Sequence, residues 1–209
     1  MLIKDRHSTH GAITRVRGRL GDIQRENRLA VSFLVQKGFS LLGCEAALGP
    51  LPEGEIAGAH AAAVRRALEE RDNLDRLTVY QPIRYAVEFE GRLTVLGVED
   101  RELYEADVAC LERINDVRPM LARSDTSPEE RRELLIESRR LMGAIRERAA
   151  ERGRRAAGNL LALMESRRVD RAILLIGGAH VPSASRELSR RGVPHLVFEC
   201  RHYDAQRGR

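Results

Sequence analysis

Short apolar runs alternate along the chain with longer stretches in which apolar residues recur at helical spacing. A short run rich in Ile, Leu and Val is typical of a buried strand, whereas recurrence every three or four residues is typical of a helix. Strands that alternate with helices predict an α/β fold, with a mainly parallel central sheet, a high helix content and helices on both faces. The predicted strands are 1–5, 39–44, 93–98, 172–176 and 195–198, with a brief extended piece at 77–80. The predicted helices are 13–37, 56–71, 83–89, one from about 101, 128–165 and 183–191.

One α/β domain is expected over 1–209, because this length suits a single hydrophobic core. The segment at roughly 101–166 has the pattern of a helical insertion between two strands. Ser127, with a proline next to it, marks the start of the long second helix of this insertion. Gly153 and Gly158 are expected to bend or split that helix.

Composition narrows the classes of partner. The net charge is +5, and nearly all of the basic residues are arginines, because Lys4 and Lys37 are the only lysines. The arginines are mixed with Asp and Glu, aromatic residues are scarce and Trp is absent, so no nucleic-acid partner is expected. No apolar run approaches the length of a membrane span, and no signal-peptide pattern is present, so no membrane partner is expected. The three cysteines form neither a C-x-x-C pair nor a disulfide framework, which favours a reducing cytoplasm.

Ionisable residues follow the ends of four predicted strands. The carboxyl ends of parallel strands meet at one edge of a sheet, where ligands bind in open α/β folds, so these side chains are expected to converge. His180 is the strongest candidate, because the two glycines before it allow a sharp turn after the strand. We interpret Glu99 and Asp100 as a turn and a helix cap rather than as ligands. The other strand ends carry Asp5 with His7, and Glu45.

The segment Ile-Gly-Gly-Ala-His-Val at 176–181, followed by a helix and a final strand, resembles the second G-x-x-H motif of the TIKI/TraB superfamily. That group includes the ChaN-like and erythromycin-esterase-like proteins. The N-terminal Lys-Asp-Arg-His, ending at His7, is similar to the first motif, with the histidine present and the glycine absent. Glu45 matches the acid after the second strand, and Arg152, in Glu-Arg-Gly, matches the arginine of the family. Leu-Gly-Val-Glu-Asp at 96–100 is similar to a stretch of bacterial relatives, and the matches keep the family order over nearly the whole chain.

The resemblance implies a hydrolase of amide or ester bonds that acts on a small-molecule or peptide substrate. It implies catalytic residues at the carboxyl edge of the sheet, namely His7, Glu45, Arg152 and His180. Two neutral histidines and a carboxylate can bind a divalent metal such as Mn, Zn or Co and leave a position for water. The expected metal ligands are His7, His10, Glu45 and His180, with Asp5 as a substitute. Without a metal, His7 or His180 would act as a general base on water, with Glu45 orienting its ring. Arg152 would stabilise an oxyanion or bind a carboxylate through two hydrogen bonds.

Other functions stay open. The same pocket could bind a small molecule, haem or a metal without catalysis, which the absent glycine of the first motif favours. The charged helix 128–165 could instead bind a partner or a second copy of the chain in a homo-oligomer, and that hypothesis predicts an exposed apolar stripe on it. For single residues, Glu45 could be only a helix cap or the partner of an arginine, and Arg152 could lie on a solvated helix face.

Overall fold

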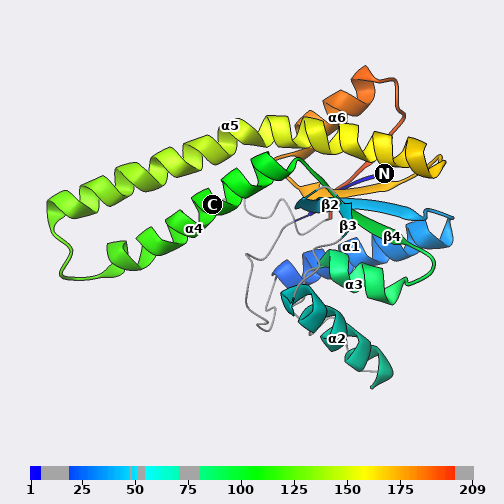
Figure 1. The fold of residues 1–209 in the computed structure, drawn as a ribbon, viewed down its shortest axis with the longest axis horizontal. Coiled ribbons are helices and arrows are strands. Elements are labelled where there is room, and N and C mark those ends of the chain that lie inside the picture. The colour runs from blue at the N-terminus through cyan, green and yellow to red at the C-terminus, as the bar shows by residue number, and fades with distance from the viewer. Residues whose placement is uncertain (6–18, 48, 51–54, 71–80, 201–209) are drawn as a thin grey trace.

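The computed structural model of the chain describes residues 1–5, 19–47, 49–50, 55–70 and 81–200. In these residues a central sheet carries helices on both of its faces (Figure 1), which confirms the predicted α/β fold. The strands are β1 (Leu2–Asp5), β2 (Leu41–Ala47), β3 (Gly49–Pro50), β4 (Thr94–Glu99), β5 (Ile173–Gly177) and β6 (Val197–Phe198). The helices are α1 (Arg19–Gln36), α2 (Glu55–Glu69), α3 (Gln81–Glu88), α4 (Arg101–Ala122), α5 (Pro128–Arg167) and α6 (Val181–Arg190).

The strands lie in the order β3-β4-β2-β5-β1-β6. All neighbouring pairs are parallel except β3, which pairs antiparallel with β4. Strand β5 lies between β1 and β2, whereas the chain connects β1 to β2 through α1. The helices that follow β1 and β2 lie on the face covered by α1 and α3. The helix that follows β5, α6, lies on the opposite face with α5. The carboxyl ends of strands at such a reversal are the usual position of a ligand site in these folds.

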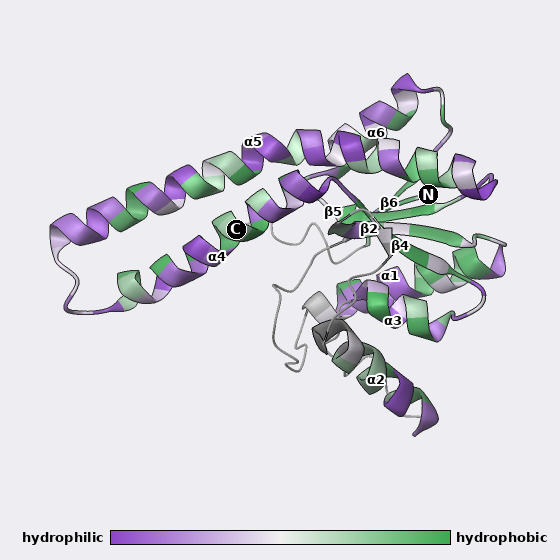
Figure 2. Cartoon of the chain, in the orientation of Figure 1, coloured by the Kyte–Doolittle hydropathy of each residue, from purple (hydrophilic) through white to green (hydrophobic). Residues whose placement is uncertain are grey.

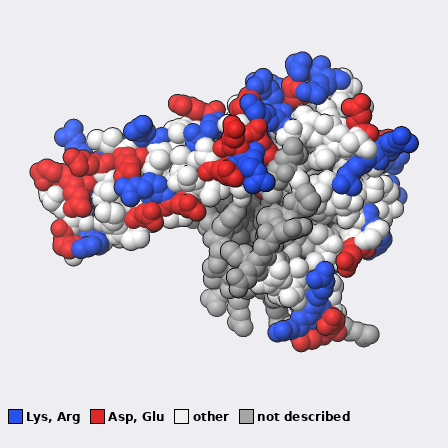
Figure 3. Space-filling view, in the orientation of Figure 1, with Lys and Arg blue, Asp and Glu red and all other residues white. Residues whose placement is uncertain are grey.

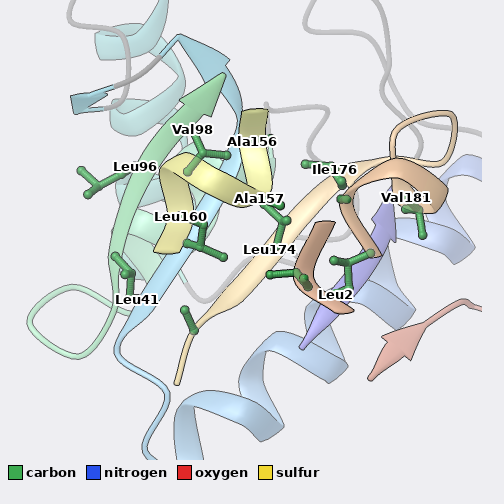
Figure 4. Packing of buried hydrophobic residues seen from close by; sticks show 13 residues of the cluster. Leu2, Leu41, Leu96, Val98, Ala156, Ala157, Leu160, Leu174, Ile176 and Val181 are labelled. Carbon is green, nitrogen blue, oxygen red and sulfur yellow. The ribbon is translucent and has the colours of Figure 1, made fainter. Parts of the chain in front are cut away.

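Alternating strand residues build a hydrophobic core on each face of the sheet. Leu174 and Ile176 of β5 pack with α5 and α6, and Figure 4 shows Ala156, Ala157 and Leu160 of α5 among the residues of this core. The neighbouring residues of β5 point to the opposite face, where they pack with α1 and α3. Both faces of the strands are therefore apolar, as their colour in Figure 2 shows, and this explains their continuous apolar runs. Helix α2 packs on α3 outside the sheet (Figure 1).

Both helices of the helical insertion begin where their polar capping residues predict. Asp100 caps α4 by accepting hydrogen bonds from the backbone of Glu102 and Leu103, and Ser127 caps α5 by accepting from Glu130. Helix α5 runs unbroken through its glycines, so the prediction that they could split it is wrong. The flanking alanines and leucines are good helix formers, and packing on the sheet offsets the weak propensity of glycine.

Helix α4 and the first half of α5 form an antiparallel pair that projects away from the sheet, called the arm below (Figure 1). Ile114 and Val117 of α4 and Leu134 of α5 are buried between the two helices. Leu135 and Ile136 stay exposed, at 42% and 56%, and both signs of charge cover the arm in Figure 3. Most of the apolar stripe of α5 therefore packs against α4 and the sheet, and two adjacent residues of it face solvent. In the described part of the chain, no helix combines the length and the apolar character needed to cross a membrane.

Some predictions fall on residues that the structure does not describe. These are the extended piece at 77–80 and the start of the helix predicted at 13–37, whose described part begins at Arg19. His7 and His10 lie in the undescribed segment 6–18.

Candidate functional site

The carboxyl ends of β2, β4 and β5 bring three predicted strand-end residues together. Glu45 lies in the last part of β2, Glu99 ends β4, and His180 follows β5. One ligand atom from each of these side chains lies within 4.8 Å of the other two. All three side chains are largely buried, and Glu45, at 12%, is the most exposed. The predicted convergence therefore occurs for these three of the four strand ends, and the site is closest to solvent at Glu45.

A β-bulge and a glycine position Glu45. Along the β2–β4 pair the register shifts, because Cys44 lies opposite Gly97 whereas Ala47 lies opposite Glu99. The extra residue in β2 lets the strand re-aim its side chains, a common use of bulges beside active sites. Glu45 Oε2 accepts a hydrogen bond of 2.7 Å from the backbone N–H of Gly177. A Cβ at Gly177 would lie 2.9 Å from that oxygen, so any other residue there would displace the Glu45 carboxylate.

His180 is held from both sides of its ring. A tight turn after β5, closed by a hydrogen bond from its own backbone N–H to Gly177, places it at the N-cap of α6. Its side chain makes no capping bond and turns instead toward α5, where Nδ1 lies 2.9 Å from the carbonyl oxygen of Ala149. A carbonyl can only accept, so Nδ1 carries a hydrogen. The other ring nitrogen, Nε2, lies 3.3 Å from Glu45 Oε1.

Arg152 joins the acidic residues of the site. It donates two hydrogen bonds to Glu99, from Nε at 2.8 Å and from Nη2 at 2.7 Å, in the bidentate geometry of an arginine–carboxylate pair. Nη2 also donates to Glu45 at 3.0 Å, and Nη1 donates to Asp107 at 2.6 Å. The buried guanidinium thus contacts three carboxylates that come from β2, β4 and α4. This geometry favours the carboxylate-binding role expected for Arg152 over that of an oxyanion donor.

Small residues on one face of α5 allow it to approach the site. Ala149, Gly153, Ala156 and Ala157 are all buried on the face that packs against the sheet and α6. At Gly153 a Cβ would lie 2.4 Å from the carbonyl oxygen of His180 and 2.2 Å from Oγ of Ser183. Glycine is needed here because the backbone of α5 touches the first turn of α6, and this contact brings Arg152 beside His180.

A second arginine extends the cluster along the arm. Arg148 lies one turn before Arg152 on α5, and its Nε donates to Asp107 at 2.6 Å. Its Nη2 lies 3.2 Å from Sγ of Cys110. Asp107 therefore accepts from both arginines and is itself buried. The contacts tie the base of the arm to the sheet edge.

Burial and charge shift the pKa values of the site residues. Burial is the largest influence on Glu99 and raises its pKa, with help from the charge of Glu45 and against the hydrogen bonds from Arg152. Burial lowers the pKa of His180, but the hydrogen bond and charge of Glu45 and the contact with Ala149 more than compensate, so the pKa is raised. Burial likewise opposes the charge of Arg152, yet its carboxylate partners raise its pKa further.

Tyr104 of α4 responds to the same acidic residues. Its pKa is raised, first by burial and then by the negative charges of Glu99 and Glu45. The phenol therefore stays protonated over a wider pH range than an exposed tyrosine would.

The charges of the cluster nearly balance. Glu45, Glu99 and Asp107 are opposed by Arg148 and Arg152, which leaves one negative charge when His180 is neutral. A proton on Nε2 of His180 would remove that excess. The two acceptors that face the ring, Ala149 O and Glu45 Oε1, would then both receive a hydrogen bond. The geometry and the raised pKa of His180 thus agree in favouring the imidazolium at low pH.

Of the predicted catalytic residues, the structure brings Glu45, Arg152 and His180 together. The alternative in which Arg152 lies on a solvated face is wrong, and Glu45 is indeed the partner of an arginine. His7 and His10 lie outside the described residues, and so does the side chain of Asp5, although its backbone in β1 pairs with Gly177 of β5.

Two members of the cluster are not among the predicted catalytic or metal-binding residues. Glu99 is expected at the converging strand ends but as part of a turn, whereas the structure shows it buried and bound to Arg152; Asp100 is the cap as expected. Asp107 carried a signal that could have found it, because it lies three to four residues from Leu103 and Cys110, on the buried face of α4 that continues through Ile114 and Val117. An acidic residue on such a face needs a cationic partner.

The described residues fit a metal only in part. Nε2 of His180 and Oε1 of Glu45 are adjacent, and the hydrogen bond from Nδ1 to a carbonyl is the usual support of a metal-binding histidine. Both oxygens of Glu99, however, accept from Arg152, whose positive charge also contacts Glu45. A divalent metal would therefore need ligands beyond the described residues.

No protein-family model, curated protein or solved structure matches this chain.

Proposed function

We propose that the protein hydrolyses ester or amide bonds, with His180 as the general base at the carboxyl edge of the sheet. The observation that supports this proposal is the pair of acceptors formed by His180 Nε2 and Glu45 Oε1, 3.3 Å apart. When the ring is neutral, one water molecule that donates a hydrogen to each of them satisfies both. Such a water is held beside a base, which is the arrangement that general-base hydrolysis needs.

The reaction then needs two proton transfers, one from water to His180 and one from His180 to the leaving group. Water attacks the carbonyl carbon while His180 Nε2 takes one of its protons, and the same proton passes to the leaving alkoxide or amine as its bond to carbon breaks. Ala149 O holds Nδ1–H and so fixes the ring and its tautomer. Arg152 is a positioning residue in this mechanism, because it binds Glu45 and Glu99 rather than facing a substrate.

A screen of ester and peptide substrates with His180→Gln tests the proposal. Glutamine can still donate to the carbonyl of Ala149 but cannot act as a base at neutral pH. We expect kcat to fall by roughly 10²–10⁴-fold, the usual contribution of a general base, with the melting temperature little changed. The control is Arg155→Met, which replaces a half-exposed arginine of α5 outside the cluster. Equal activity in wild type and His180→Gln would refute His180 as the base.

A second candidate is a metal-dependent hydrolase or a metal-binding protein without activity. The proximity of ligand atoms from Glu45, Glu99 and His180 favours it, and His7 and His10 are the sequence candidates for further ligands. When bound, a divalent metal would lower the pKa of a water ligand and polarise a carbonyl. Metal content of the purified protein, measured by mass spectrometry beside His180→Gln, separates these possibilities. Stoichiometric metal that is lost in the variant supports the metal site, and absence of metal from an active wild type supports the metal-free mechanism.

A further inference from the structure

Ser185 and His195 form a second close pair of polar side chains, unconnected with the cluster around Glu45. Ser185 lies in α6, and His195 lies in the segment between α6 and β6. Ser185 Oγ is 2.7 Å from His195 Nε2, and both residues are only partly buried. A hydroxyl and an imidazole at this separation have the geometry of a nucleophile and its base.

A third group orients the histidine. His195 Nδ1 lies 3.0 Å from the carbonyl oxygen of Val193, which can only accept, so Nδ1 carries the hydrogen. In the neutral ring Nε2 is then a lone pair, and the hydroxyl of Ser185 donates to it. The carbonyl takes the place that a carboxylate has in a catalytic triad: it holds the ring in the tautomer that can accept the serine proton.

An apolar cavity lies beside His195, and Ser185 reaches it through this histidine. It has a volume of about 320 Å³ and lies at the amino ends of β1 and β5, at the opposite end of the sheet from His180. His195 lines it, together with Leu160, Met164, Leu174, Leu188 and Leu196. The size is at the lower end of small-molecule sites, and the walls suit a short hydrocarbon chain.

We propose that Ser185 and His195 form a second, nucleophilic site that cleaves esters of short apolar acids, with the acyl chain in this cavity. Ser185 Oγ attacks the ester carbonyl carbon while its proton moves to His195 Nε2. The bond from carbon to the alkoxide breaks, and the same proton passes to the leaving alcohol. Water then attacks the acyl-serine with proton transfer through Nε2, which releases the acid and restores the hydroxyl. The inference does not depend on the proposed function of His180, whose reaction forms no covalent intermediate.

Labelling with an alkyl fluorophosphonate tests the nucleophile directly. The reagent forms a bond from phosphorus to serine oxygen and releases fluoride, and peptide mapping by mass spectrometry shows which serine carries it. We expect labelling at Ser185 and its loss in Ser185→Ala. The control is Ser189→Ala, which removes an exposed serine from the same helix and is expected to label as wild type does.

His195→Gln separates a catalytic pair from a purely structural one. Glutamine can accept the hydrogen bond of Ser185 but cannot take its proton, so the melting temperature should hold while the labelling rate falls by roughly 10²-fold or more. Equal rates in wild type and His195→Gln would overturn the proposal, and so would labelling of Ser185 no faster than that of Ser189.

Chain-length dependence tests the cavity. p-Nitrophenyl butyrate should release a burst of nitrophenol equivalent to one acyl group per chain, and Ser185→Ala should show none. Each methylene that enters an apolar cavity gains roughly fourfold in rate constant, so the burst with butyrate, which has two more methylenes, should be about 16-fold faster than with acetate. Equal burst rates for the two esters would rule out the cavity as the acyl site.

Discussion

At the scale of single residues, Arg152 has the strongest influence on the site. It is buried and donates four hydrogen bonds to three carboxylates from different elements. Lysine could not replace it, because an ammonium cannot span three acceptors in one plane. Replacing Arg152 therefore measures how much a buried guanidinium contributes to the free energy of unfolding.

Arg152→Met is expected to destabilise the fold strongly. It would leave Glu99 and Asp107 buried without their main cation, and removing one partner of a buried ion pair costs about 3–5 kcal/mol. Urea denaturation of Arg152→Met beside Arg155→Met measures the difference. Arg155 is half exposed and pairs with Asp100 at the surface, so its variant should unfold close to wild type. Similar unfolding midpoints for the two variants would show that the carboxylates find other partners or take up protons.

The raised pKa of His180 predicts opposite pH trends for stability and activity. The group is favoured as the imidazolium in the folded state, so its contribution to stability is complete below the ordinary value of 6.5 and is lost as the pH rises through the higher folded value. Activity needs the neutral ring, so it rises through the same window. Glu45 favours the charged ring, Arg152 opposes it, and Glu99 lies beside both.

Glu45→Gln should shift that window to lower pH. Without the carboxylate, burial and Arg152 dominate, and both lower the pKa of His180. An NMR titration of the His180 ring gives the pKa directly, and the pH profile of kcat/KM gives it in the reaction. The mechanism fails if the alkaline rise of activity in the wild type does not coincide with the NMR titration of His180, or if Glu45→Gln moves neither.

The residues of the cluster differ in how far the sequence alone predicts them. Glu45 and His180 could be found from the residues alone, because each follows an apolar run, and strand ends meet at one edge. Arg152 was selected only through the family resemblance, since one arginine in a charged helix has no distinguishing pattern. Asp107 could be recognised only by asking which polar residues interrupt a buried face. Its role depends on the packing of α4 against α5, which local spacing does not encode.

At the scale of elements, glycine in α5 has two different roles. At Gly153 the helix backbone touches α6, whereas a Cβ at Gly143, in the arm, would meet nothing within 4 Å. Gly153→Ala should destabilise the protein by about 1–3 kcal/mol, the usual cost of overpacking, and should lower activity by moving His180. Gly143→Ala should instead stabilise it by about 0.5–1 kcal/mol, because alanine is the better helix former. Thermal and urea unfolding of both variants give the comparison, and a neutral Gly153→Ala would mean that the two helices can separate without loss.

Helix α1 shows a limit of periodicity. Leu29 and Phe33 fit the apolar spacing expected for helix 13–37, yet both are more than half exposed in α1. The buried face contains Ile23, Val31 and Leu34 and also accepts the polar Asn27. Hydrophobicity alone cannot fix the phase of a helix when two apolar stripes lie side by side, because the choice between them is made by the surface against which the helix packs.

At the scale of the whole molecule, the parallel sheet separates two kinds of chemistry. Its carboxyl edge holds the charged cluster, as the order β2-β5-β1 and the reversal of connections require. Its amino edge holds an apolar cavity lined by His195, the partner of Ser185. The first could be predicted from the alternation of strands and helices. The second could not, because it depends on a loop that folds His195 back onto α6.

The arm is the part of the molecule that the proposed reaction does not need. The charged residues of the cluster on α4 and α5 are Asp107, Arg148 and Arg152, and none of them lies farther from the sheet than the contact between Cys110 and Arg148. Deleting 111–117 and 133–139 would remove about two turns from each helix and keep their rotational phase. We expect kcat/KM to stay unchanged and stability to fall, since the deletion removes the buried Ile114, Val117 and Leu134.

Light scattering on the same shortened variant tests whether the arm joins two copies of the chain. If the exposed Leu135 and Ile136 lie in a homo-oligomeric interface, the wild type should be an oligomer and the variant a monomer. If both are monomers with equal activity, the arm has no role in assembly or in catalysis. A monomeric variant that keeps its fold but loses activity would instead show that the reaction requires the arm, which would contradict a site complete at the sheet edge.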